Sequence, residues 1–233
     1  ASDWSSDVCS SDLHVFAFDK LISVHRGGYT PFTIDITDCI KDGEAEIKVH
    51  CYGDPRDGKQ PSGKQSPKNE SYGCYYTRCT GIWQTVWLEE VETCYLQSLD
   101  ITPDVDNSCV HLALRTVGKG VKRISVSAKY QGETVGKAQV SVSENCTETL
   151  CSIPLKKLFL WDVGQPNLYD LEVEIQSEHG TDSVKSYFGM RKIELDEKGM
   201  KLNGKRVFQR LVLDQGYRSE ERRVGKECRS RWS

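Results

Sequence analysis

Two tyrosines and an arginine lie close together in the chain and offer binding chemistry. Tyr75, Tyr76 and Arg78 fall within a stretch of four residues. Each tyrosine presents a flat aromatic face with a polar tip, and the arginine presents several N–H donors in a fixed fork. This set offers flat faces on which a ligand ring can lie and donors for its hydroxyl or carboxylate groups. For Arg78, an ion pair within the fold is the favoured alternative.

Motifs for several common reactions are missing from the sequence. It contains no HExxH, GxSxG or GxGxxG, so metalloprotease, serine-hydrolase and dinucleotide-binding functions have no support. Residues 53–60 approach a phosphate-binding loop, but Gln60 replaces the Ser or Thr that would bind magnesium, and Pro61 follows where a helix should begin. We therefore expect no nucleotide and no other cofactor.

The cysteines do not match a recognisable metal site. None of them forms a CxxC pair and no matching histidine spacing accompanies them, so we expect no bound metal. Free buried thiols are the favoured interpretation, and disulfides are the alternative for a secreted protein. Apart from Cys9 and Cys228 near the ends, they are Cys39, Cys51, Cys74, Cys79, Cys94, Cys109, Cys146 and Cys151.

Apolar residues alternate with polar ones through most of the chain, which indicates β-strands rather than helices. The clearest runs are residues 110–114, 124–128 and 171–175. Asn203 and Gly204 stand between two β-capable arms and predict a hairpin, because both residues tolerate positive φ. Short strands separated by Gly-containing turns predict an all-β fold.

The sequence changes character twice along its length. Residues 53–73 are polar and rich in Gly, Pro, Lys and Gln, and are too long for a hairpin loop, so they are disordered or functional. Alternating strands begin again after Val91, and we place a domain boundary near Glu92. About seven short strands in about a hundred residues are typical of an immunoglobulin-like β-sandwich.

Both ends of the chain differ from the middle and are interpreted as translated sequencing adapters. Residues 10–13 can be encoded as TCT TCC GAT CT, and the reverse complement of that stretch reads Arg-Ser-Glu-Glu, as at residues 218–221. A disordered head and a basic tail are the alternative. We therefore treat residues 1–13 and 218–233 as artefacts and residues 14–217 as the natural segment, cut at both sides.

Charge and hydropathy argue against two classes of partner. The net charge is −3 and no basic stripe is visible, which argues against nucleic acid. No apolar run approaches the length of a membrane span, so we expect no membrane partner. A cytoplasmic location is slightly favoured over secretion, with the natural start of the chain out of view.

Three stretches stand in a recognisable order. They are RGGYTPF at 26–32 with YYTRCTGIWQTVWLE at 75–89, then LWDVGQPNLY at 160–169, and then YFGMRK at 187–192 with LNGK at 202–205. Their order and spacing resemble glycoside hydrolase family 2, the group that includes β-galactosidases and β-glucuronidases. The resemblance covers essentially all of residues 14–217. Within it, we expect scaffold roles for Trp83, Trp161 and Phe188.

The resemblance implies a layout and a chemistry. Residues 14–92 would form part of a jelly-roll sugar-binding-type domain, 93–192 an immunoglobulin-like domain, and 193–217 the start of a catalytic TIM barrel with 210–213 as its first strand. Family 2 enzymes hydrolyse β-glycosides with retention through two carboxyl groups. In the family both are glutamates on later barrel strands, which puts them beyond Tyr217 and leaves this chain inactive alone.

The resemblance also implies which residues reach a carbohydrate substrate. Asp214 and Gln215 would lie at the end of the first barrel strand, near the active site, with an ordinary strand-end turn as the alternative for Asp214. Many relatives carry an Asn-Arg-His type segment there, which leaves the sugar preference open. A jelly-roll loop leaning over the barrel mouth would bring Tyr75, Tyr76 and Arg78 to the substrate. The resemblance also allows a homo-oligomer of the full-length parent protein.

One alternative function comes from a different class. Two β-sandwiches could form a stand-alone carbohydrate-binding or adhesion module, whose natural chain would end near Lys192. The hairpin and strand expected beyond that residue favour the enzyme. A disulfide-rich receptor is a third possibility, against which the irregular cysteine spacing argues.

Overall fold

The fold was analysed in a computed structural model, which describes residues 2–7, 12–28, 30–54, 56, 63–78, 80–82, 85–143 and 146–211. The chain divides into two compact units, Val91–Arg210 in one and Ala1–Glu90 with Leu211–Ser233 in the other. Within the described ranges the one helical element is the short 3-10 turn η1, Thr37–Cys39. No helix among these residues has the length and apolar character needed to cross a membrane. The fold is all-β, as the alternation predicts.

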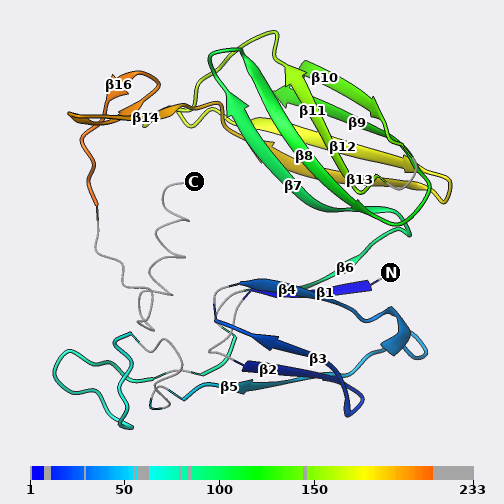
Figure 1. The fold of residues 1–233 in the computed structure, drawn as a ribbon, viewed down its shortest axis with the longest axis vertical. Coiled ribbons are helices and arrows are strands. Elements are labelled where there is room, and N and C mark those ends of the chain that lie inside the picture. Colours follow the sequence, from blue (N-terminus) through cyan, green and yellow to red (C-terminus); the bar gives the residue numbers. More distant parts are fainter. Residues whose placement is uncertain are drawn as a thin grey trace. The chain divides into compact units, whose positions relative to one another are not determined.

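The unit Val91–Arg210 contains a seven-stranded antiparallel sandwich (Figure 1). One sheet has the order β10-β9-β12-β13 and the other the order β11-β8-β7. The fourth strand, β10, pairs with the third rather than with the fifth. The strands are β7 Tyr95–Asp104, β8 Cys109–Val117, β9 Val121–Tyr130, β10 Glu133–Ser141, β11 Glu148–Pro154, β12 Tyr169–Ser177 and β13 Thr181–Phe188.

The sandwich core forms from the side chains that alternation places on one face of each strand. On β8, Val110, Leu112 and Leu114 are buried while His111 between them is exposed. The same alternation buries Ile124, Val126 and Ala128 on β9 and Leu171, Val173 and Ile175 on β12. These three runs confirm the sequence prediction, and the residues form one continuous cluster.

Tyr169 fixes the connection between β11 and β12. It is the first residue of β12 and is fully buried. Its hydroxyl accepts a hydrogen bond from the Phe159 backbone N–H at 2.5 Å and donates to the Lys157 carbonyl at 3.3 Å. Its ring stacks on Phe188 with centroids 5.0 Å apart. A tyrosine that bonds to upstream backbone at this place is the tyrosine corner of immunoglobulin-like sandwiches.

A small three-stranded sheet follows the sandwich, built from β14 Ile193–Asp196, β15 Gly199–Leu202 and β16 Lys205–Arg206. Asn203 and Gly204 form the predicted turn, with φ of 51° and 76°. The Asn203 side chain accepts from the Lys192 backbone N–H at 3.0 Å and donates to the Trp161 carbonyl at 2.9 Å. The amide therefore ties this sheet to the sandwich.

The predicted first barrel strand at 210–213 is not present as far as the structure describes it. Residues 207–211 have no regular secondary structure, and 212 and 213 lie outside the described residues. A parallel barrel strand needs a hydrogen-bonded neighbour on each side. Within the described ranges no strand follows β16 that could supply one.

The other unit has two three-stranded sheets, in the orders β4-β1-β6 and β3-β2-β5. Val15 from one sheet and Ile34 from the other share a small core with Ile36. The backbone of β1 belongs to the segment that we interpret as adapter sequence, and pairs with β4 and β6. The strands are β1 Ser2–Asp7, β2 Asp12–Ala17, β3 Lys20–Arg26, β4 Pro31–Asp35, β5 Ile47–Tyr52 and β6 Val86–Glu90.

The boundary between the two units can be compared with the domain boundary predicted near Glu92. The units divide between Glu90 and Val91, while the detailed domain limits and the adapter interpretation stay predictions.

All described cysteines are free thiols, but only Cys94 is buried. The favoured interpretation of free buried thiols is wrong about burial for Cys74 and Cys146, which are exposed, while the other described thiols are half-buried.

Candidate functional site

The loop that carries Tyr75 and Tyr76 is held by a short backbone ladder. Tyr76 donates its N–H to the Lys64 carbonyl at 2.8 Å and accepts from the Ser66 N–H at 2.7 Å. Tyr72 and Tyr75 exchange backbone hydrogen bonds of 3.2 and 2.9 Å across a tight turn. Ser66 is fully buried and its hydroxyl accepts from the Lys68 N–H at 3.0 Å. These bonds give the loop a defined backbone path.

This loop also carries an aromatic pair with partly exposed rings. The rings of Tyr72 and Tyr75 lie 5.2 Å apart at their centroids, tilted by 32°. The Lys68 ammonium sits 4.3 Å from the centre of the Tyr72 ring, a cation–π geometry. Tyr75 is exposed and Tyr76 is half-buried. Of the two tyrosines singled out from the sequence, Tyr75 therefore presents the more open face.

Arg78 lies beside polar and charged groups of the same unit. Its guanidinium donates to the Asn69 side-chain oxygen. The pKa of Asp54 is lowered to about 2, mainly by its side-chain and backbone hydrogen bonds with Arg56 and to a smaller extent by the charge of Arg78. Asp54 and Arg56 form a fork-like pair with Nε to Oδ1 at 2.8 Å. The hydrogen-bond partner found for Arg78 is thus an amide rather than a carboxylate.

Some predicted residues lie outside the described part of the chain, and some residues near the loop were not predicted. Asp214 and Gln215 lie outside the described residues, as does Trp83. Tyr72, Lys68 and Asn69 were missed by sequence reasoning, although they bring an aromatic face, a cation and an amide next to the predicted residues. The signal that could have found them is the polar, tyrosine-rich composition of this loop.

A concave region lies on the unit Val91–Arg210. It has a volume of about 530 Å³ and is lined largely by apolar side chains, among them Trp161, Leu168 and Tyr187. Arg191 covers the Trp161 ring at 5.0 Å, and Gly189 allows that ring to approach the backbone. Phe188 is buried, as a scaffold role requires, whereas Trp161 is only half-buried.

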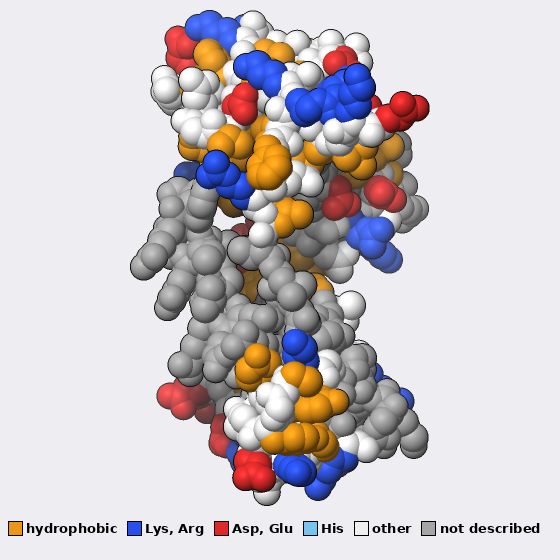
Figure 2. Space-filling model, turned by 90° about the vertical axis from the view of Figure 1, so that its left-hand side faces the viewer, with side chains coloured by type: hydrophobic (Ala, Val, Ile, Leu, Met, Phe, Trp, Pro, Cys, Tyr) orange, Lys and Arg blue, Asp and Glu red, His pale blue; other side chains and the backbone are white. Residues whose placement is uncertain are grey.

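Exposed apolar side chains accompany this concave region. Leu168, Tyr187, Ile193 and Leu195 are between 46% and 80% exposed. Figure 2 shows hydrophobic side chains lying among Lys, Arg, Asp and Glu side chains on one face of the molecule. Exposed apolar side chains of this kind are typical of surfaces that contact other proteins.

Metal-ligating side chains meet at one place in the described part of the chain. Asp104, Cys109 and His111 bring one ligand atom each within 4.8 Å of one another. They lie at the end of the sandwich where β7 and β8 are joined. The pKa of the Cys109 thiol is raised, first by loss of hydration and then by the charge of Asp104.

Comparison with known proteins identifies a family and several relatives that this chain resembles. Residues 94–191 match the sequence model described as glycosyl hydrolases family 2. A putative β-glucuronidase of Formosa agariphila is 33% identical over 194 residues, which cover 80% of this chain and 22% of that protein. A β-galactosidase of Rhizobium meliloti is 27% identical, over 77% of this chain and 24% of that protein.

Solved structures agree with this at the level of fold. A glycosyl hydrolase family 2 member from Bacteroides cellulosilyticus superposes with a TM-score of 0.68 at 21% identity, over 88% of this chain and 26% of that one. A β-glucuronidase from Ruminococcus gnavus in complex with D-glucuronic acid gives a TM-score of 0.67 at 17% identity, over 89% of this chain and 36% of that one. The chain spans about a quarter of the length of the curated relatives it matches.

Proposed function

This chain belongs to glycoside hydrolase family 2, and on that premise we propose that its parent protein is a retaining β-glycosidase of β-galactosidase or β-glucuronidase type. The match of residues 94–191 to the family carries this proposal, and the names of the relatives give the substrate class. The chain supplies the N-terminal β-sandwich part of such an enzyme.

The chemistry of retention explains why this part should not act alone. Two carboxyl groups about 5 Å apart are needed, one as acid and base and the other as nucleophile. Family resemblance assigns both to barrel strands beyond Tyr217. The residues of this chain would then orient the substrate and the barrel, without touching the bond that breaks.

We expect the 233-residue chain to release no nitrophenol from nitrophenyl β-D-galactoside or β-D-glucuronide above the rate in buffer. The reason is the missing carboxylate pair, without which the oxocarbenium-like transition state has no stabilising groups. A family 2 β-glucuronidase run alongside shows that the assay works. Turnover that co-purifies with the chain and disappears on its thermal unfolding would contradict the assignment of the catalytic pair to later strands.

The loop at 63–78 is the part of the chain best suited to contact sugar. Tyr75 presents an exposed aromatic face for the apolar side of a sugar ring, next to the Tyr72 ring. The same loop carries two cations, Lys68 over the Tyr72 ring and Arg78, which donates to the Asn69 side chain. A carboxylate-bearing sugar is matched better by this set than a neutral one, because a charge-assisted hydrogen bond is the stronger kind.

Replacing Arg78 with methionine should weaken binding of glucuronic acid by about tenfold and leave binding of galactose unchanged, since only the acid loses a charge-assisted hydrogen bond. Titration of the chain with each sugar, followed by nuclear magnetic resonance, measures both affinities. Tyr75→Ala should weaken both sugars by about three- to tenfold through lost stacking.

Tyr187→Ala serves as the control for these two variants. Tyr187 is 67% exposed and belongs to the other unit. It should leave both affinities as they are. Equal losses in Tyr187→Ala and Tyr75→Ala, or an unchanged affinity in Arg78→Met, would remove the loop from the proposal.

A stand-alone carbohydrate-binding module is the second candidate function. The exposed pairing of Tyr72 and Tyr75 favours it, because exposed aromatic faces bind the apolar side of sugars without any catalytic group. This candidate predicts that the natural reading frame contains no barrel, whereas the leading proposal requires one.

A further inference from the structure

The alternation of β8 puts a cysteine and a histidine on the same solvent-facing side of the sandwich. Cys109 and His111 are two residues apart on one strand, and the buried Val110 lies between them on the other face. Asp104 stands directly opposite Cys109 in the antiparallel register. Three chemically different ligand groups therefore converge beside the turn of the β7–β8 hairpin.

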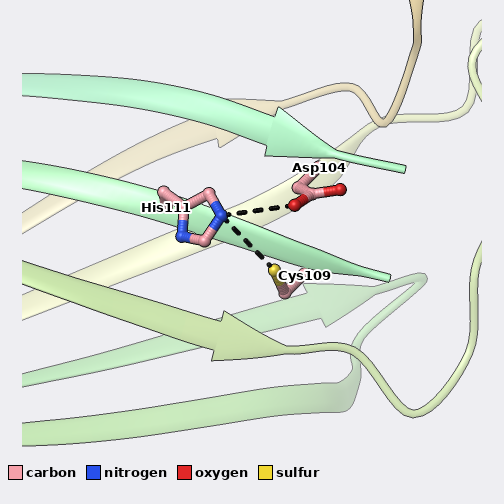
Figure 3. A group of neighbouring side chains, drawn as sticks. All are labelled: Asp104, Cys109 and His111. Carbon is pink, nitrogen blue, oxygen red and sulfur yellow. Dashed lines mark hydrogen bonds and ion pairs between the residues drawn. The ribbon is translucent and has the colours of Figure 1, made fainter. Parts of the chain in front are cut away.

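The side chains point toward one another, as Figure 3 shows, with one ring nitrogen of His111 facing both other residues. Its Nε2 atom lies 3.6 Å from Cys109 Sγ and 3.5 Å from Asp104 Oδ2. In a tetrahedral zinc site with ordinary bond lengths, the corresponding edges are about 3.6 Å for nitrogen to sulfur and about 3.4 Å for nitrogen to oxygen. The two distances at His111 Nε2 are close to these edges, and all three ligand atoms lie within 4.8 Å of one another.

The groups around the cluster hold two of the ligands in place. His111 Nδ1 lies 2.7 Å from Ser152 Oγ on the neighbouring strand β11. Donation of the Nδ1 proton to that hydroxyl leaves the Nε2 lone pair free for a metal, the arrangement common for histidine ligands. Asp104 accepts bonds from the Asn107 backbone and side chain at 3.0 and 2.8 Å, which fix its carboxylate.

We propose that Asp104, Cys109 and His111 form a surface site for a zinc-class transition-metal ion. The ligand set of one sulfur, one imidazole nitrogen and one carboxylate oxygen suits Zn²⁺, while the sulfur ligand disfavours Mg²⁺ and Ca²⁺. Asp104 and His111 side chains are 26% and 48% exposed, so water can complete the coordination. The bound ion would link the two strands beside the turn that joins β7 to β8.

The test uses the reduced, chelator-treated 233-residue chain and titrates it with Co²⁺, which replaces zinc and reports on thiolate ligation by its charge-transfer absorption. The proposal expects this absorption in the native chain and its removal by added Zn²⁺. Cys109→Ser and His111→Gln should each lower Co²⁺ affinity more than about 100-fold, because loss of a supporting group alone costs 10- to 100-fold.

Matched variants separate this site from the other thiols and from effects on folding. Cys146→Ser removes an exposed thiol elsewhere in the unit and should leave Co²⁺ affinity unchanged. Ser152→Ala should lower it about 10- to 100-fold, and Ser152→Thr should restore it. The metal-free melting temperature checks that each variant folds. Absence of the charge-transfer absorption in the native chain would overturn the proposal, and so would its persistence in Cys109→Ser.

Discussion

Gly118→Ala is expected to lower the free energy of unfolding of the unit Val91–Arg210 by about 4 kcal/mol, from backbone strain and overpacking that each cost about 1–3 kcal/mol. Gly118 has φ of +98° in the turn after β8. A Cβ there would lie 2.3 Å from the Thr93 carbonyl oxygen and 2.7 Å from Cys94 Sγ. Cys94 is buried, so neither neighbour can move aside easily.

Gly132→Ala is the control for this prediction. Gly132 also has positive φ, +83°, but its Cβ would meet nothing within 4 Å. It should therefore cost only the backbone strain, about 1 kcal/mol. Native-state hydrogen exchange of the β9 and β12 amides measures both values for this unit alone. Equal losses of unfolding free energy in the two variants would contradict the close packing of Thr93 and Cys94 against Gly118.

Tyr169→Phe is expected to cost the same unit about 2 kcal/mol, because it leaves the Phe159 N–H without its partner. The aromatic stack on Phe188 is retained in this variant, so the loss reports on the hydroxyl. Burial, the main cause, raises the pKa of this tyrosine, in agreement with a hydroxyl that stays protonated and donates to the Lys157 carbonyl.

Tyr187→Phe is the matched control, since Tyr187 is also a β-sheet tyrosine of this unit but is 67% exposed. The loss of unfolding free energy in Tyr187→Phe should be close to zero. The same hydrogen-exchange measurement applies to both variants. A loss in Tyr169→Phe no larger than in Tyr187→Phe would show that the hydroxyl does not hold the connection between β11 and β12.

The sandwich was predictable because its strands carry the period-two signal in the sequence itself. Val110, Leu112 and Leu114 read as one buried face, and β8 buries these residues. The Asn203–Gly204 hairpin was predictable for a similar reason, since both residues take the positive φ that the turn requires. Local chemistry decides these elements, so a single sequence reveals them.

The proposed metal site was not predictable from spacing alone. A search for CxxC pairs overlooks Cys109 and His111, because a strand brings residues two apart to one face. Asp104 joins them only through the register of β7 on β8. The pairing of Tyr72 with Tyr75 likewise depends on a turn whose backbone bonds no motif announced. Both the three-residue cluster and the tyrosine pair depend on which segments of the chain are hydrogen-bonded to each other. Periodicity within a single strand does not reveal such pairing.

The central claim is that this chain is the non-catalytic N-terminal part of a family 2 β-glycosidase. Sequencing the source DNA across codons 14 and 217 tests it most directly. The account predicts a reading frame that replaces both end segments and continues into a barrel with two glutamates at the ends of later strands. A frame that contains the two end segments as they stand and stops soon after Ser233 would contradict it, and a carbohydrate-binding module would then be the better explanation.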